Sequence, residues 1–275
     1  MLTRGTLSPG RPRNYVRYAV VGHYLVEGWL KDLGIQLIDA VEGRQRTLDV
    51  EGHVAEIGVH HGKLFILLSL IRRPGERAVA LDLFEDQELN VDNSGRGDRE
   101  RFLANLDRHH ADAADVVVQK SDSNELDGAG LRELAGGPLR IVSVDGGHTA
   151  ELTEHDLTTA ADALADGGVV ILDDCFNEVF PAVAEGAQRF LAARDDIRAI
   201  GAGGNKTFLC HRDHAAAYRE ALVERAEALH LYCQEHEFVG APFLSVFPRD
   251  PRALWDYWRL YARGWVDSKL PVRRR

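Results

Sequence analysis

Two groups of polar residues in the sequence could do chemistry, and each follows a short apolar run. The run IVSV leads to Asp145, two glycines and His148, and the run VVIL leads to Asp173 and Asp174. If these runs are neighbouring strands, about 4.8 Å apart, the three carboxylates converge at one edge of a sheet. Carboxylates without a cysteine or histidine cluster favour a hard cation such as Mg²⁺.

His148 lies three residues after Asp145, where a helix is expected to begin. From there it can face the same cavity and act as a general base. The structural alternatives are an aspartate that caps a helix and a histidine on the surface. One carboxylate alone favours those alternatives, whereas three on consecutive strands favour function. Unpaired carboxylates repel and their pKa values rise, so a positive group is expected among them.

A second pattern follows the first clear strand. Glu56, Gly58 and Gly62 form an E-x-G-x-x-x-G motif, and Asp82 ends the next strand. Glycines after a strand let the backbone approach a ligand, and a carboxylate about 20 residues later can accept both ribose hydroxyls of a nucleoside. After the third strand, Asp122 and Ser123 could bind an adenine amino group, with a turn and helix cap as the alternative.

Two other signals are set aside. The stretch GAGGNKT (201–207) lacks the phosphate-binding pattern because Asn205 precedes the lysine, so a hairpin turn is favoured. The adjacent histidines 60 and 61 are expected to point apart, as neighbours on a helix or strand do, and so to chelate a metal poorly.

Strand-like runs alternate with helical ones along the chain. Strands are predicted at 53–59, 78–84, 115–121, 139–145, 167–174, 197–203 and 206–212, and helices at 63–72, 98–109, 124–135, 149–165 and 179–193. Repeated strand–helix units that end in a hairpin predict an α/β fold, a mostly parallel sheet with helices on both faces.

Three segments are expected around this pattern. Residues 1–44 form an N-terminal helical extension or lid, residues 45–212 form the core, and residues 213–275 form a helical, aromatic-rich C-terminal extension. Within the core, the polar residues 85–97 predict a long loop at the active edge of the sheet.

Glu56, Gly58, Gly62 and Asp82 resemble the S-adenosylmethionine site of class I methyltransferases. That resemblance covers residues 45–212 and implies a Rossmann-like sheet of seven strands with a terminal antiparallel hairpin. It also implies S-adenosylmethionine as the cofactor.

The second group resembles a branch of that superfamily, the metal-dependent macrocin-type O-methyltransferases that modify sugars of antibiotics and other glycosides. The resemblance implies Mg²⁺ on Asp145, Asp173 and Asp174, bound also by vicinal hydroxyls of the acceptor. It makes His148 the base, because Gly stands at position 147 where other members place an aspartate. The implied acceptor is a small-molecule glycoside, a nucleotide sugar or an oligosaccharide.

The amino-acid composition of the chain argues against some classes of binding partner. The 275 residues carry a net charge of −10, which argues against a general binder of nucleic acid or anionic membranes. Three cysteines without a CxxC pair indicate a reduced, cytoplasmic compartment, and no apolar run predicts a membrane span. The possibility of a homo-oligomer stays open.

Three alternatives to a sugar O-methyltransferase remain. They are a methyltransferase with a catechol or small-phenol acceptor, a hydrolase using the same carboxylates, and a catalytically silent member of the fold that binds a partner.

Overall fold

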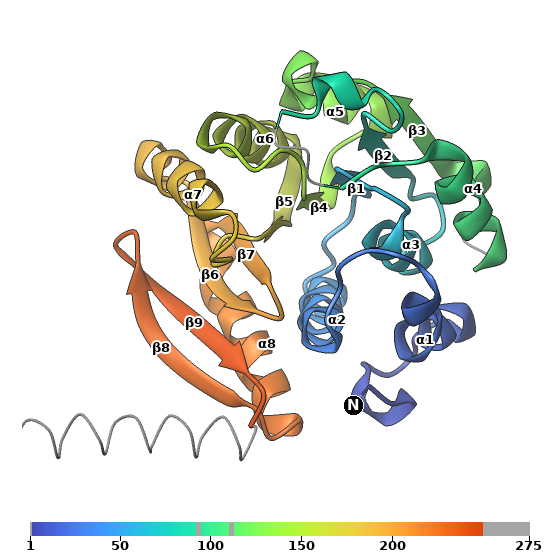
Figure 1. Cartoon of the computed structure of the whole chain (residues 1–275). Helices are drawn as coiled ribbons and strands as arrows, with labels where there is room; N and C mark the ends of the chain where they lie inside the picture. Colours follow the sequence, from blue (N-terminus) through green and yellow to red (C-terminus); the bar gives the residue numbers. More distant parts are fainter. Residues whose placement is uncertain (1, 92–94, 110–112, 250–275) are drawn as a thin grey trace, which may run out of the picture.

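The computed structural model describes residues 2–91, 95–109 and 113–249, which form a nine-stranded sheet flanked by helices (Figure 1). The strands are β1 (His53–Ile57), β2 (Ala78–Asp82), β3 (Val116–Lys120), β4 (Leu139–Val144), β5 (Leu164–Asp173), β6 (Ile197–Gly203), β7 (Lys206–His211), β8 (Tyr232–Phe238) and β9 (Ala241–Phe247). The helices are α1 (Arg13–Val20), α2 (Asp32–Thr47), α3 (Lys63–Leu70), α4 (Arg99–Arg108), α5 (Gly128–Ala135), α6 (Ala150–Ala163), α7 (Pro181–Ala193) and α8 (Ala215–Ala228).

The strand order is β3-β2-β1-β4-β5-β7-β6-β9-β8. Strands β1 to β5 pair in parallel, whereas β7 pairs antiparallel with both β5 and β6. The chain runs outward from β1 to β3 and then returns to β4, on the other side of β1. Ligands of open α/β sheets bind beyond the carboxyl ends of the strands at such a switch point. The predicted α/β fold is therefore confirmed.

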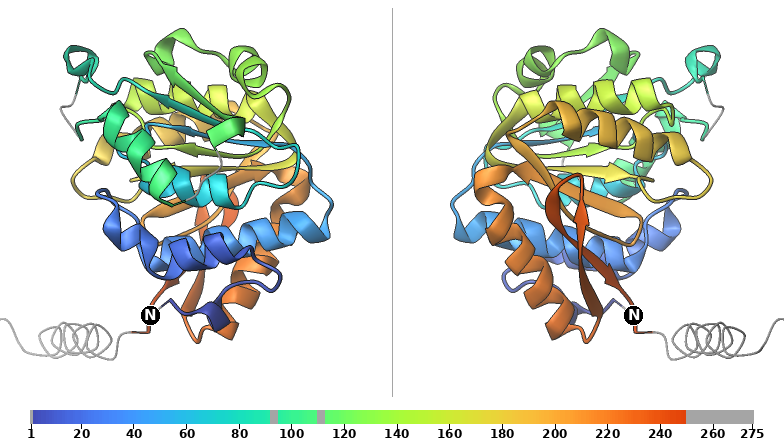
Figure 2. Two further views of the ribbon diagram at one scale, coloured as in Figure 1. Left: turned by 90° about the vertical axis from the view of Figure 1, so that its right-hand side faces the viewer. Right: turned by 90° about the vertical axis from the view of Figure 1, so that its left-hand side faces the viewer.

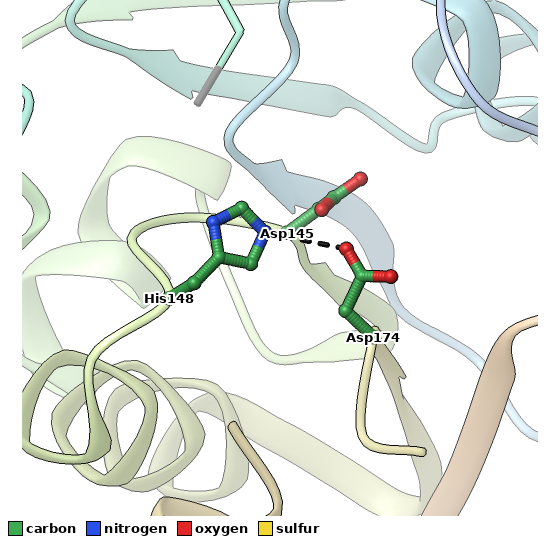
Figure 3. Close-up of side chains that lie close together, drawn as sticks. All are labelled: Asp145, His148 and Asp174. Carbon is green, nitrogen blue, oxygen red and sulfur yellow. Dashed lines mark ion pairs between the residues drawn. The ribbon is translucent and has the colours of Figure 1, made fainter. Parts of the chain in front are cut away.

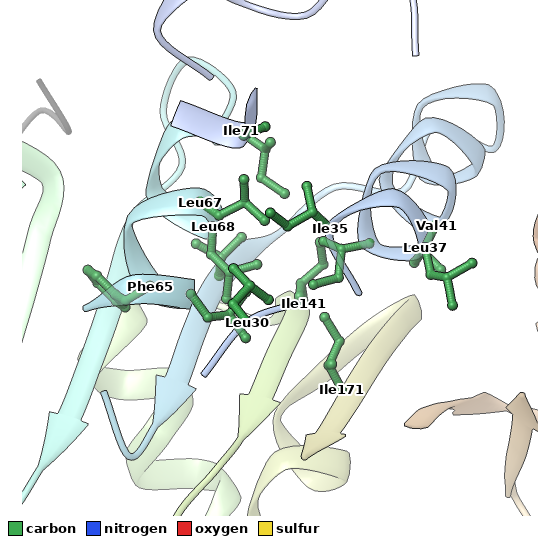
Figure 4. Close-up of a cluster of buried hydrophobic side chains, with 14 of the residues drawn as sticks. Leu30, Ile35, Leu37, Val41, Phe65, Leu67, Leu68, Ile71, Ile141 and Ile171 are labelled. Carbon is green, nitrogen blue, oxygen red and sulfur yellow. The ribbon is translucent and has the colours of Figure 1, made fainter. Parts of the chain in front are cut away.

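The central strands are apolar because both of their faces are covered. Alternate residues of a strand point to opposite faces, so Ile141 packs in one core and Val142 in the other. Figure 2 shows α1 and α2 on one face of the sheet and α6 and α7 on the other. Figure 4 shows part of the first core, where side chains of α2 and α3 meet Ile141 and Ile171.

Helix α6 begins directly after the candidate histidine. The Thr149 side chain accepts a hydrogen bond from the backbone N–H of Leu152 at 3.2 Å, which caps the helix. Because this cap ends the short turn after β4, His148 is held at the carboxyl edge of the sheet.

The C-terminal segment differs from the helical extension predicted for 213–275. Helix α8 is present, but β8 and β9 then form a hairpin, and β9 adds to the sheet beside β6. The sheet of the described residues thus has nine strands, not seven. The turn at Val239 and Gly240 has positive φ at both residues (47° and 71°), as two-residue hairpins require. Residues 250–275 lie outside the described part.

The N-terminal segment packs onto the core. Tyr15 and Tyr18 of α1 are buried, and the Tyr18 hydroxyl donates to the Lys63 carbonyl at 2.6 Å. The division of the chain at residues 44 and 212 stays a prediction. No helix in the described ranges is both long and apolar enough to cross a membrane.

Candidate active site

A cavity of about 1070 Å³ opens at the carboxyl ends of β1, β2, β4 and β5. Most of the residues predicted for the site line it. These are Gly58, Asp82, Asp122, Ser123, Asp145, His148, Asp173 and Asp174. Part of the predicted 85–97 loop and part of the segment between α1 and α2 also line the cavity, including Leu89, Asn90, Tyr24 and Trp29.

Asp145, His148 and Asp174 meet at one side of this cavity (Figure 3). Each offers one ligand atom, and these atoms all lie within 4.8 Å of one another. His148 Nε2 lies 3.3 Å from Asp174 Oδ2, and the imidazole stacks on the Phe180 ring with centroids 3.9 Å apart. The stack and the carboxylate together fix the orientation of the imidazole.

Asp173 lies outside that group. Its Oδ1 accepts hydrogen bonds from Asn205 Nδ2 at 2.8 Å and from the backbone N–H of Asp174 at 3.0 Å. Its Oδ2 is bonded to the ammonium of Lys206. Lys206 also lies 3.9 Å from Asp145 Oδ2. The positive group expected among the carboxylates is therefore present within the protein.

The surroundings of Asp145 and Asp174 shift the pKa values of these two carboxylates in opposite directions. Burial, followed by the charge of Asp173, raises the pKa of Asp145 well above its usual range. Burial also acts to raise the pKa of Asp174, but hydrogen bonds from His148, Asn177 and Asn205 lower it to about 2. Asp174 is thus a stable anion beside His148, able to bind a cation or an imidazolium.

The turn after β1 explains the motif glycines. A Cβ at Gly58 would lie 1.9 Å from the Asp145 carbonyl oxygen, and one at Gly62 would lie 2.7 Å from the Phe102 ring. Both residues have positive φ (81° and 88°). Gly58 therefore lets the ends of β1 and β4 approach each other beside the cavity, and Gly62 leaves room for the Phe102 ring.

Asp82 holds the same turn. Its Oδ2 accepts from the backbone N–H groups of Val59 at 2.7 Å and His60 at 2.8 Å, and its Oδ1 accepts from Phe84 N–H at 2.6 Å. A carboxylate with two oxygens has about four acceptor sites, so these bonds leave capacity for a ligand hydroxyl.

Asp122 and Ser123 stand at the cavity wall after β3. Asp122 Oδ1 accepts from the backbone N–H of Asn124 at 3.0 Å, and His155 Nε2 lies 3.0 Å from the Ser123 carbonyl oxygen. Asp122 thus caps the short turn that follows, and it also faces the cavity. Their predicted role toward adenine stays a prediction.

Glu56 and Gly62 are not in the cavity lining. Glu56 is 2% exposed, lies opposite Ser143 in the β1–β4 pairing, and points to the α2–α3 side of the sheet. Its Oε2 has no hydrogen-bond partner among the described residues. Burial raises the pKa of Glu56 to about 8. Glu56 therefore lies behind the site instead of facing a ligand.

We expect Glu56→Gln to remove a pH dependence of stability. The pKa rises from 4.5 to about 8 on folding, so between these values the folded state holds a proton that the unfolded state releases. The free energy of unfolding contributed by this group is fully present below pH 4.5 and is lost as pH rises through 8. Denaturant unfolding from pH 5 to pH 8 should give a flatter profile for the variant. Parallel profiles for variant and wild type would show that Glu56 ionises normally.

The histidine pair at 60 and 61 does not point apart. The two ring centroids are 3.7 Å apart and stacked, and His60 has φ of 50°. The prediction was wrong because these residues lie in the turn after β1, where the alternation of a strand does not apply.

Several residues at the site were not predicted from the sequence. Asn177 and Phe180 follow β5, and Asn205 and Lys206 belong to the β6–β7 hairpin. The GAGGNKT stretch is a hairpin turn, as predicted, but its Asn and Lys face the carboxylates. Only the pairing of β5 with β7, which sets Asp173 opposite Lys206, reveals this.

Comparisons with known proteins agree with the fold. Residues 55–175 match a family model described as a methyltransferase domain. Among solved structures, the O-methyltransferase NovP aligns with a TM-score of 0.51 and 18% identity, over 64% of this chain and 78% of its own. A Klebsiella pneumoniae protein provisionally described as an O-methyltransferase aligns with a TM-score of 0.51 and 14% identity, over 75% of this chain and 92% of its own.

The calicheamicin methyltransferase CalS11 also aligns, with a TM-score of 0.47 and 20% identity, over 63% of this chain and 79% of its own. A search of the curated proteins finds no match to this sequence. Identities this low speak for a shared fold alone, and the family match covers the strands that build the cavity. Residues 55–175 therefore match a methyltransferase domain, and the chain shares the fold of NovP and of the Klebsiella pneumoniae protein.

Proposed function

We propose that this protein is an S-adenosylmethionine-dependent, Mg²⁺-assisted O-methyltransferase that acts on a hydroxyl of a sugar or glycoside. The observation that carries the proposal is that one cavity joins two half-sites. This cavity is lined both by the proposed cofactor residues Gly58, Asp82 and Asp122 and by the proposed acceptor-side residues Asp145, His148 and Asp174. Methyl transfer needs the acceptor oxygen in line with the sulfonium methyl group, so both half-sites must share one space.

The donor set fits a hard cation. Asp145 and Asp174 offer carboxylate oxygens at the cavity surface, the ligands that Mg²⁺ prefers. Bound there, Mg²⁺ would lower the pKa of an acceptor hydroxyl and orient vicinal oxygens.

His148 is the proposed general base. Its Nε2 lies 3.3 Å from Asp174 Oδ2, so the carboxylate holds the imidazole in place. Asp174 then stabilises the imidazolium that forms when the acceptor proton is taken. The cofactor brings the activated methyl group, so the protein mainly orients the oxygen and removes its proton.

The proposed activity can be tested with methyl-labelled S-adenosylmethionine and a panel of acceptors. We expect transfer to glycosides, oligosaccharides or nucleotide sugars, with catechols as the competing class. Calorimetry with S-adenosylhomocysteine checks the cofactor separately. Binding of that nucleoside without transfer to any hydroxyl would point to the catalytically silent alternative.

Removal of divalent metal is expected to abolish turnover. EDTA should stop methyl transfer and excess Mg²⁺ should restore it, because the hydroxyl is a weak acid without a cation. Binding of S-adenosylhomocysteine should survive EDTA, since the cofactor half-site contains none of the proposed metal ligands. Full activity in chelator would refute the role of the metal.

Asp82→Asn is expected to weaken S-adenosylhomocysteine binding by roughly 10- to 100-fold, which corresponds to about 1.5–3 kcal/mol for a lost charged hydrogen bond. Calorimetry measures this change. Glu88→Gln, in an exposed acidic residue of the same region that lies outside the cavity lining, serves as the control and should bind as wild type does. Equal affinities for the two variants would remove Asp82 from the cofactor site.

A further inference from the structure

Lys206 is a buried lysine within the acidic cluster. It stands opposite Asp173 in the antiparallel pairing of β5 with β7 and is 1% exposed. Its ammonium bonds to Asp173 Oδ2 and lies 3.9 Å from Asp145 Oδ2. Burial acts to lower the pKa of Lys206, but Asp173, Asp145 and Glu56 outweigh it and raise the pKa. The lysine is therefore a buried ammonium paired with Asp173, and it lies outside the cavity lining.

The three carboxylates of the cluster are not equivalent toward this cation. Both oxygens of Asp173 accept hydrogen bonds, and one of the donors is the ammonium of Lys206. Asp174 also accepts hydrogen bonds, from Asn177 and Asn205, and lies beside His148, so the feature that sets Asp173 apart is its ammonium partner. The Asp173 side chain is 3% exposed, whereas that of Asp145 is 28% exposed and that of Asp174 is 12% exposed. Asp173 thus lies behind the other two, with its lone pairs directed to protein donors.

We propose that Lys206 is a built-in counter-ion that takes Asp173 out of the metal-binding set. A divalent cation is then left with Asp145 and Asp174, beside His148. This differs from the ligand set that the sequence resemblance implies, in which Asp173 binds the metal. The inference rests on the proposed function for the presence of a metal, but the partition of the carboxylates rests on the contacts of Lys206 and on the exposure of the three side chains.

The negative charges of the cluster explain why a lysine is buried at this position. Asp173 bonds to its ammonium and Asp145 lies 3.9 Å from it, and Glu56 also acts on its pKa. Without an internal cation, these buried groups would repel one another or take up protons whenever no metal is bound. Lys206 compensates the cluster, and it also repels a divalent ion placed on Asp145. Its removal should therefore strengthen metal binding and weaken the metal-free fold.

The test uses calorimetry to measure the binding of Mn²⁺ and of Mg²⁺ to the purified full chain. Thermal melts with and without metal measure the stability of each variant. The variants are Asp145→Asn, Asp174→Asn, Asp173→Asn and Lys206→Met. Lys120→Met is the matched control, because Lys120 pairs with Glu85 and Asp86 at the surface, 35% exposed. Binding of S-adenosylhomocysteine confirms that each variant is folded.

We expect Asp145→Asn and Asp174→Asn to weaken metal binding by at least roughly 10- to 100-fold. Asp173→Asn should change metal affinity by less than roughly threefold while lowering the melting temperature. Lys206→Met should bind metal roughly tenfold more tightly or better, since the positive charge that lies 3.9 Å from the proposed ligand atom Asp145 Oδ2 is gone. Its metal-free melting temperature should fall and be restored by Mn²⁺. Lys120→Met should match wild type in both measurements.

The proposal is overturned if Asp173→Asn loses as much affinity as Asp145→Asn, or if Lys206→Met binds metal no better than wild type. If Lys206→Met fails to fold, the Asp173→Asn result decides alone. Metal binding by Lys206→Met but not by wild type would support the counter-ion and refute the metal-assisted function. Binding by neither protein would overturn the counter-ion proposal as well.

Discussion

Replacing His148 by alanine is expected to lower turnover by roughly 10²- to 10⁴-fold, the usual contribution of a general base. The imidazole stacks on Phe180 and pairs with Asp174 in the part of the cavity proposed for the acceptor, so its loss removes the proposed proton acceptor. Affinity for S-adenosylhomocysteine should change little, because that ligand occupies the other side. Single-turnover rates with labelled cofactor measure the loss at the chemical step.

A pH profile separates a base from a residue that only supports the fold. A base must be neutral to accept a proton, so the wild-type rate should rise with pH and the variant should lose that rise. His214→Ala is the matched control, since His214 pairs with Asp166 at 2.9 Å outside the cavity lining. If the turnover of His148→Ala falls by less than tenfold and its pH–rate profile matches that of wild type, His148 is not the general base.

Replacing Arg140 by methionine is expected to lower the free energy of unfolding by roughly 3–5 kcal/mol, because it leaves a buried carboxylate without its partner. Arg140 is fully buried, and its guanidinium contacts Glu76 through two bonds of 2.7 and 2.8 Å. It also donates to the Gln45 side chain at 3.0 Å and to the Ile71 carbonyl at 2.9 Å. These bonds tie β4 to α2 and to the end of α3, beneath the strand that carries Asp145.

Denaturant unfolding measures the loss, and a surface arginine supplies the control. Arg189 pairs with Glu151 and Glu185 but is 43% exposed, so Arg189→Met should cost less than about 1 kcal/mol. The double variant Arg140→Met, Glu76→Gln should regain part of the stability, because no buried charge is then left alone. Equal losses for Arg140→Met and Arg189→Met would contradict the assigned role of burial.

The elements and the strand-end carboxylates were predictable from local pattern. Buried parallel strands read as apolar runs, so β1 to β7 lie close to their predicted ranges. In such a sheet a residue that ends or follows a strand lies at the carboxyl edge, and Asp82, Asp145 and Asp174 all line the cavity there. His148 could be expected beside them because only a short turn separates it from β4.

The β8–β9 hairpin could not be predicted in the same way. The described side chains of β8 are mostly exposed, so it shows no apolar alternation, and its stability comes from β9, which is anchored by buried Phe243 and Leu244. The stacked His60 and His61 likewise depend on the backbone of a turn and not on residue types.

By itself the sequence determined which residues stand at strand ends and so which carboxylates reach the cavity. Only the tertiary structure decided what each carboxylate does there. Asp173 and Asp174 are adjacent in the chain, yet Asp173 turns to Lys206 and Asp174 turns to His148. The physical reason is that Asp173 is the last residue of β5, whereas Asp174 lies in the following turn with a left-handed backbone (φ 57°), which directs its side chain elsewhere. Their partners come from strands and turns whose register is set by the packing of the whole sheet.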